Sequence, residues 1–131
     1  MRNLILLLFL LIVNFSVAQP NTSIKKETKL YIRGLSSENT IRRAQLEKLD
    51  TIYITGKDSG EYKIKSVTLS FVFQGAVRNM ELQRTDIIPI IQNSISHFKE
   101  TKKLGFEKII IRNYKAKTEK FLPSFTITII D

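Results

Sequence analysis

The clearest hydrophobic pattern in this chain is the alternation of apolar and polar residues within Lys63–Phe73. The odd positions from 67 to 73 carry Val, Leu or Phe, whereas positions 66, 68 and 70 carry Ser or Thr. Successive side chains of a strand point to opposite faces, so this spacing predicts a half-buried strand with its large groups on one face. The same alternation at Phe125, Ile127 and Ile129 predicts a strand over Leu122–Ile130.

Shorter apolar runs bounded by turn residues predict further strands. Gly75 permits a turn that returns the following segment as an antiparallel partner of the first strand. Between two of the runs, apolar residues spaced by helical turns predict a short helix or helical turn over Ile41–Leu49, capped by Asn39 or Thr40. The additional strands are expected over Leu30–Arg33, Thr51–Thr55, Ala76–Leu82 and Glu107–Ala116.

The hydrophobic period changes to that of a helix between Thr85 and Phe98. Ile87, Ile91 and Ile95 recur every four residues and therefore lie along one side of an α-helix. With Thr85 as the N-cap, Pro89 falls in the first turn, where no intrahelical hydrogen bond is lost. Gly105 is expected to provide the stop that follows this helix.

Residues 1–18 have the pattern of a secretory signal peptide. Arg2 is followed by ten apolar residues and then by Ser16-Val17-Ala18, which suits cleavage near Ala18. The apolar run is too short for a permanent membrane span. The mature chain is expected to begin with a polar, flexible lead-in over 19–29 and to fold as a single domain over 30–131.

Charge and cysteine content narrow the class of protein. The chain has a formal net charge of +9 and no cysteine, and the predicted signal peptide removes only one of the positive charges. An exported domain without disulfides must rely on an ordinary apolar core. These features favour a periplasmic or secreted bacterial protein and, in general terms, an acidic partner.

The order of these elements resembles the C-terminal domain of the GldM gliding-motility and type IX secretion proteins of the Bacteroidota. The resemblance spans roughly Thr40 to Asp131. It rests on the segments Thr40–Leu46, Tyr62–Phe71, Gly75, the helix Thr85–Phe98 leading into Lys102-Lys103-Leu104-Gly105, Lys108–Lys117 with its Lys-Ala turn, and Leu122–Ile127 with its Leu-Pro start.

The resemblance implies a mainly β fold, an immunoglobulin-like antiparallel β-sandwich with one short α-helix at about Thr85 to Phe98. It also implies a periplasmic interaction module, and the family offers no catalytic residue to transfer. Full-length members carry a membrane helix, a helical region and several β-domains ahead of this one. The motor coupling of those parts is therefore not carried over to this chain.

The residues that carry common catalytic chemistry are scarce in this sequence. His97 is the only histidine, and without cysteine it cannot form a multi-ligand metal site of the zinc type. No nucleophile elbow and no phosphate-binding glycine loop are present. Asp58 and Glu61 lie in a loop, where a solvated turn is a better interpretation than an acid–base pair. We therefore expect no catalytic, cofactor-binding or metal-binding residue and no enzymatic activity.

Basic residues are concentrated between Lys99 and Lys120, and they have two interpretations. They could contact an acidic protein, a lipid head group or a surface polysaccharide. They could instead protect strand edges and helix ends, which is the interpretation that the sequence favours. Nucleic acid is not expected, because aromatic residues are not interleaved with the basic ones. The candidate interaction surface comprises Lys102, Lys103, Arg112, Tyr114, Lys115, Lys117 and Lys120.

Together these patterns predict a non-enzymatic, exported interaction module of the cell envelope that binds another envelope protein. The alternative is a small protein that uses the basic surface from Lys99 to Lys120 to bind a polysaccharide or a lipid head group. These patterns are also compatible with a homo-oligomer formed through a sheet edge. No integral membrane segment is expected in the mature chain.

Overall fold

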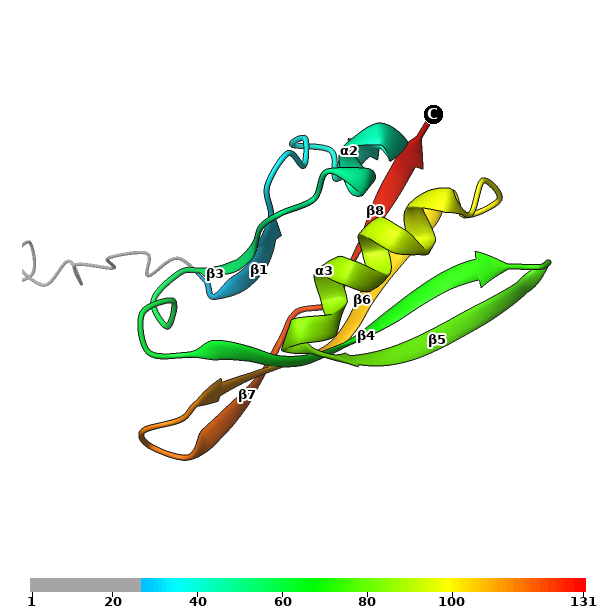
Figure 1. Ribbon diagram of the computed structural model, residues 1–131. Coiled ribbons are helices and arrows are strands. Elements are labelled where there is room, and N and C mark those ends of the chain that lie inside the picture. The colour runs from blue at the N-terminus through cyan, green and yellow to red at the C-terminus, as the bar shows by residue number, and fades with distance from the viewer. Residues whose placement is uncertain (1–26) are drawn as a thin grey trace, which may run out of the picture.

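The structure, a computed structural model, describes residues 27–131 and contains a six-stranded sheet, a two-stranded sheet and short helices (Figure 1). The predicted signal peptide 1–18 and most of the predicted lead-in lie outside the described residues. The elements are β1 Lys29–Ile32, β2 Thr40–Arg42, α2 Arg43–Glu47, β3 Ile52–Thr55, β4 Lys63–Phe73, β5 Ala76–Gln83, α3 Arg84–Asn93, the 3₁₀ turn η1 Ile95–His97, β6 Lys103–Asn113, β7 Thr118–Leu122 and β8 Phe125–Ile130.

Strand β6 organises the larger sheet, whose order is β2-β8-β6-β4-β5. One edge of β6 pairs along most of its length with β4, and the other edge is shared by two strands. Residues 103–106 of β6 pair with β8, and residues 109–113 pair with β7. All of these pairs are antiparallel, but β2 lies parallel to β8, which departs from the predicted purely antiparallel sandwich.

The break between β7 and β8 explains why the predicted strand Leu122–Ile130 is too long. Leu122 ends β7, and β8 begins only at Phe125, after Pro123 and Ser124. Proline has no amide hydrogen for a sheet ladder and favours such an interruption. Across from this break, Lys108 adopts a positive φ of 44°, and the register of β6 shifts there. Strand β6 starts at Lys103, whereas the sequence predicted a start at Glu107.

Helix α3 confirms the predicted apolar stripe but corrects the predicted ends. Ile87 and Ile91 are buried, as is Ile95 in the following 3₁₀ turn. The N-cap is Gln83 rather than Thr85, so Pro89 lies inside the helix and not in its first turn. The α-helix ends at Asn93. Gly105 is not a helix stop, because it lies within β6.

The molecule has two layers, with the six-stranded sheet forming one of them (Figure 1). The other layer consists of α3, α2 and the β1–β3 sheet, which lie on the same face of the larger sheet. The core between them includes Val67 and Leu69 of β4, Phe106 of β6 and Ile127 of β8, each with no exposed area. The predicted mainly β fold with two sheets and one short helix is therefore confirmed.

The folded region includes residues that precede its predicted start at Leu30. Thr28 is buried, and its hydroxyl group donates a 3.0 Å hydrogen bond to Asp58. Gly56, with φ of 103°, packs so closely that an added Cβ would lie 2.6 Å from the carbonyl oxygen of Glu27. Thr28 and Lys29 therefore belong to the folded domain and not to a flexible lead-in.

The segment predicted as a helix over Ile41–Leu49 contains two elements instead. Ile41 belongs to β2, where it pairs with Ile129 of β8 and is almost fully buried. The helix α2 then occupies only Arg43–Glu47, and Leu46 is its buried residue. The expected cap at Asn39 or Thr40 is wrong, because the N-cap is Arg42.

Candidate functional site

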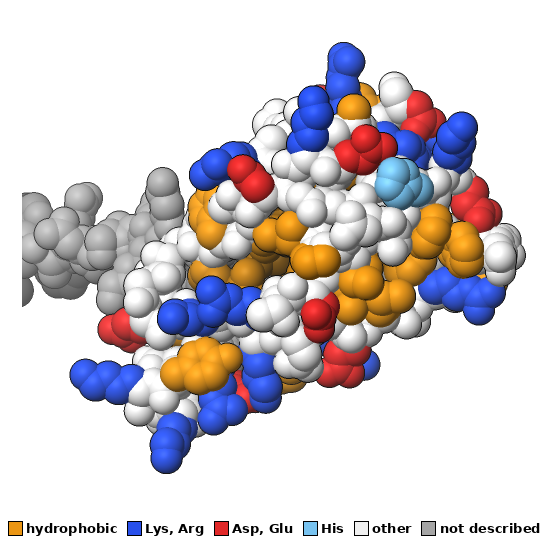
Figure 2. All heavy atoms as spheres, viewed as in Figure 1, with side chains coloured by type: hydrophobic (Ala, Val, Ile, Leu, Met, Phe, Trp, Pro, Cys, Tyr) orange, Lys and Arg blue, Asp and Glu red, His pale blue; other side chains and the backbone are white. Residues whose placement is uncertain are grey.

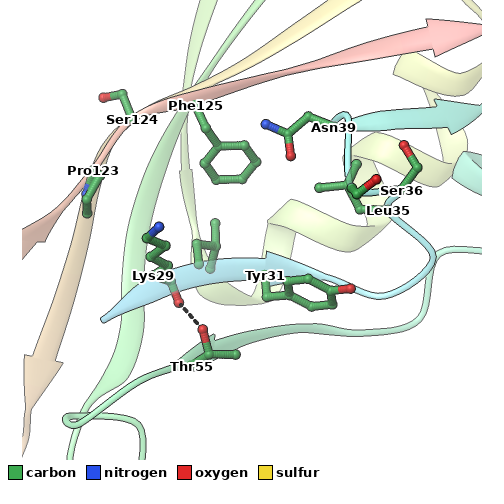
Figure 3. Close-up of a pocket in the computed structure, with 11 residues that line it drawn as sticks. Lys29, Tyr31, Leu35, Ser36, Asn39, Thr55, Pro123, Ser124 and Phe125 are labelled. Atoms are coloured by element: carbon green, nitrogen blue, oxygen red, sulfur yellow. Dashed lines mark hydrogen bonds between the residues drawn. The ribbon is translucent and has the colours of Figure 1, made fainter. Parts of the chain in front are cut away.

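A groove lies between β1 and the start of β8 and has a volume of about 560 Å³ (Figure 3). Its lining residues come from β1, from the loop before β2, from the end of β3 and from the link between β7 and β8. They are Lys29, Leu30, Tyr31, Leu35, Ser36, Ser37, Asn39, Thr55, Pro123, Ser124 and Phe125.

The β1 side of the groove is a strand edge without a neighbour among residues 27–131. Strand β1 pairs only with β3. The amide of Arg33 donates to the carbonyl oxygen of Thr51, and backbone groups of an antiparallel strand alternate between its two sides. The N–H and C=O of Leu30 therefore point away from β3 and toward the groove.

The β8 side of the groove is a second open edge. Strand β2 pairs only with residues 128–130 of β8, so the first half of β8 has a neighbour only in β6. The amide of Thr128 donates to Asn39 on the β2 side, whereas that of Ile129 donates to Lys102 on the β6 side. By the same alternation, the N–H and C=O of Thr126 point to the open side.

The groove combines an apolar floor with a polar rim. The ring of Phe125 faces the space between the two edges (Figure 3) and stacks on Phe106 with ring centroids 4.9 Å apart. Leu35 is half-buried on the opposite wall. The rim carries mostly hydroxyl and amide groups, and Lys29 is the one charged residue in the lining. Such a surface suits an uncharged or weakly acidic segment with apolar side chains on one face.

Sequence reasoning did not predict this groove. Periodicity identified β1 and β8 as strands, but it carries no information about which strand edges stay open. The sequence signal closest to the site is Pro123, which marks the break that frees the first half of β8.

The predicted interaction residues do not form one surface, which corrects the expectation of a continuous basic region. Lys102 directly precedes β6 and Lys103 begins it, whereas Arg112 and the residues up to Lys120 lie at its far end, in the following turn and in β7. Lys103 and Asn113 are the two ends of an 11-residue strand and lie roughly 33 Å apart. The two groups must therefore be considered separately.

Near the start of β6, Lys102 belongs to an ion cluster that the sequence did not predict. The side chain of Asp131 accepts from Lys102 and, at 2.5 Å, from Nε of Arg43. Arg43 is only 12% exposed, and its guanidinium also donates 2.9 Å hydrogen bonds to the carbonyl groups of Phe98 and Thr101. Hydrogen bonds from Lys102 and Arg43 lower the pKa of Asp131 to about 2. This cluster connects α2, the residue that follows β8, and the loop before β6.

Acid is therefore expected to destabilise the fold. The lowered pKa of Asp131 means that its contribution is complete above its ordinary pKa of 3.8 and is lost as the pH falls toward about 2. Melting temperatures measured between about pH 5 and pH 2 should fall less steeply for Asp131→Asn than for the wild type. Asp50→Asn, which alters an exposed and loose ion pair, serves as the control with a wild-type slope. Equal slopes for all three proteins would contradict this assignment.

At the far end of β6, the other predicted residues surround the β6–β7 hairpin. Arg112 lies 5.5 Å from the ring centre of Tyr114 and 3.3 Å from Glu119. Lys65 of β4 approaches the same carboxylate at 2.6 Å. The hydrogen bond from Lys65, and then the charges of Lys65 and Arg112, lower the pKa of Glu119. Arg112 is thus paired with Glu119, although its buried Nε has no hydrogen-bond partner among residues 27–131.

Lys120 is also paired, with the loop residue that the sequence suggested to be solvated. Its ammonium group lies 3.2 Å from Asp58 and 4.9 Å from the ring centre of Tyr62. Asp58 is only 15% exposed, which corrects the expected solvated turn. Partial burial opposes ionisation of Asp58, but hydrogen bonds from Thr28 and Lys120 outweigh it and lower its pKa. The hydrogen bond to Asp58 raises the pKa of Lys120.

Lys115 and Lys117 differ from these residues, because both are exposed and neither forms an ion pair within residues 27–131. His97 is exposed, and its Nδ1 lies 3.9 Å from Glu47. Among the described residues, no group of three or more His, Cys, Asp or Glu side chains could hold a metal ion. Over the same range, no helix combines the length and apolar character needed to cross a membrane.

No protein-family model, no curated protein and no solved structure matches the chain. The resemblance to the GldM C-terminal domain therefore stays a prediction. What the fold and the site define is a mainly β domain with a groove between two open strand edges and a separate basic hairpin.

Proposed function

We propose that this protein is a non-enzymatic interaction module of the cell envelope that binds an extended segment of another envelope protein in the groove between β1 and β8. The observation that carries this proposal is the pair of open strand edges on the two sides of one apolar groove. A peptide strand placed there could hydrogen-bond to Leu30 on one side and to Thr126 on the other.

The dimensions of the groove suit a short strand. Strand β1 has four residues, which corresponds to roughly 13 Å of extended chain. The bound segment would therefore be about four or five residues long, with alternate apolar side chains directed to Phe125 and Leu35. Main-chain hydrogen bonds would supply affinity, and the pocket for alternate side chains would supply selectivity.

The location and the lack of enzymatic activity are supported by the sequence. The pattern of residues 1–18 favours export to the periplasm or beyond the cell, and the resemblance to GldM favours an interaction role. Because an exported chain meets other proteins of the cell envelope, the proposed partner is one of these. The predicted alternative, in which the whole region from Lys99 to Lys120 binds a polysaccharide or lipid head group, is weakened by the separation of its two ends along β6.

The proposal can be tested with peptides selected for binding from a random display library. Binding peptides are expected to slow amide hydrogen exchange at Leu30 and Thr126. Thr126→Pro removes the N–H that points to the open side and should weaken binding about tenfold, since one hydrogen bond and the close approach of the strand are lost. Thr126→Ala keeps the N–H and should bind as the wild type does. The Thr126 side chain is exposed, so neither change disturbs the core.

A second variant covers the case in which Thr126→Pro does not fold. Ser37 is exposed and lines the groove, so Ser37→Trp should block the site while leaving the melting temperature unchanged. Peptides that protect amides elsewhere, or that bind Ser37→Trp as tightly as the wild type, would rule the proposal out. Failure to select any peptide would count against it equally.

A further inference from the structure

The β6–β7 hairpin projects from the body of the protein at the end of the sheet opposite the β4–β5 hairpin (Figure 1). It combines positive charge with exposed aromatic rings. Figure 2 shows Lys and Arg side chains gathered around this end of the molecule, with a hydrophobic side chain among them. We propose that this hairpin docks the protein on an anionic phospholipid surface. The inference is independent of the groove and goes beyond the proposed function.

The aromatic residues of the hairpin are unusually exposed. Phe121 is 73% exposed and Tyr114 is 56% exposed. Phe121 pairs with Ile110, which alternates with the buried Ile109 and Ile111, so Phe121 lies on the face away from the core. Residues 27–131 therefore leave most of the Phe121 side chain uncovered. Aromatic rings of this kind are well suited to the boundary between lipid head groups and acyl chains.

The charge around these rings is strongly positive. Between Lys108 and Lys120 the chain has five basic residues and one acidic residue, Glu119. That carboxylate already accepts from Lys65 and Arg112. Lys120 is paired with Asp58, whereas Lys115 and Lys117 project from the turn without an ion pair in the described part of the chain. These two lysines are therefore available to phosphate groups outside the protein.

The turn that carries the lysines is ordered before any contact is made. The side-chain oxygen of Asn113 accepts hydrogen bonds from the amides of Lys115, at 3.1 Å, and Ala116, at 3.0 Å. Tyr114 lies under the guanidinium of Arg112. Binding would thus order few backbone groups. A soluble phosphate could meet the lysines but not the aromatic rings, which is why the geometry favours a lipid surface.

The absence of tryptophan from the chain allows a direct test. Phe121→Trp places a single tryptophan at the proposed contact, and its emission should shift to shorter wavelength on vesicles of phosphatidylcholine and phosphatidylglycerol at low salt. Val77→Trp is the matched control, because Val77 is 68% exposed but lies in the β4–β5 hairpin. It should show no shift. Vesicles of phosphatidylcholine alone should shift neither variant.

Charge variants in the Phe121→Trp background test the role of the lysines. Replacing Lys115 and Lys117 by Gln should weaken vesicle binding about 25-fold, from the typical contribution of each lysine near an anionic membrane. Replacing Lys48 and Lys103 by Gln should change binding by less than about twofold, because both are exposed and lie outside the paired segment 109–122 of the hairpin. Co-sedimentation of the wild-type chain with the same vesicles checks that the tryptophan itself does not create the affinity.

The proposal is overturned if wild-type protein does not sediment with phosphatidylglycerol vesicles, if Val77→Trp shifts as much as Phe121→Trp, or if the hairpin lysines have no larger effect than the control lysines. Inorganic phosphate distinguishes the two sources of the anion. Competition by phosphate at a concentration matched in ionic strength to a chloride control would indicate a soluble phosphate ligand instead of a membrane.

Discussion

A chain that lacks residues 125–131 is expected not to unfold cooperatively, because it loses β8 from the interior of the larger sheet. Strand β8 lies between β2 and β6, and it is the only neighbour of β2 in the described structure. Ile127 and Ile129 are buried, and each contributes roughly 1.5 to 3 kcal/mol. The free energy lost with these side chains, and with the Phe125 ring that stacks on Phe106, is comparable with the total stability of about 5 to 15 kcal/mol of a typical domain.

Thermal melting followed by near-ultraviolet circular dichroism tests this expectation. The full-length Ile130→Ser variant is the control, since Ile130 is 42% exposed and its replacement should change stability by less than about 0.5 kcal/mol. A truncated chain with a sharp transition near that of the full-length protein would show that β8 is dispensable for the core.

Arg43→Met is expected to lower the free energy of unfolding by about 2 to 4 kcal/mol. The guanidinium of Arg43 is mostly buried and donates to the carbonyl groups of Phe98 and Thr101 as well as to Asp131. Removal of these donors leaves carbonyl oxygens with restricted access to water and separates a partly buried ion pair. Methionine retains much of the side-chain volume, so the change reports mainly the lost hydrogen bonds.

Urea unfolding of Arg43→Met and Arg33→Met compares the contribution of a buried arginine to the free energy of unfolding with that of an exposed one. Arg33 forms a 3.8 Å ion pair with Asp50, and both side chains are about two-thirds exposed. Such surface pairs contribute little, so Arg33→Met should lie within about 0.5 kcal/mol of the wild type. If both variants have the same stability, Arg43 does not hold the loop before β6 in place.

The strand predictions succeeded where the alternation was strong and local. The bounds of β4 agree with the prediction, and its residues Val67, Leu69 and Phe71 are buried on one face as expected. The ends of elements were less predictable, because they depend on neighbours in space. Helix α3 begins one residue before Thr85, where β5 ends, and tolerates Pro89 in its interior.

The short elements were missed for a related reason. Strand β2 has three residues, and its extended conformation is set by pairing with β8, which lies almost ninety residues further along the chain. Nothing in the local sequence separates Thr40–Arg42 from the helix that follows. In the same way, β7 was not recognised as a strand because four of its five residues are exposed, and its place is determined by pairing with β6.

The sequence by itself determined that this chain forms a mainly β domain with one apolar-striped helix, because side-chain periodicity is a local property that each strand and helix displays alone. Only the tertiary structure decided which edges stay open. It separated Lys103 from Arg112 along β6, paired Lys120 with Asp58, and set Leu30 opposite Phe125 across a groove. These outcomes depend on register between distant segments, and hydrophobic pattern alone does not encode that register.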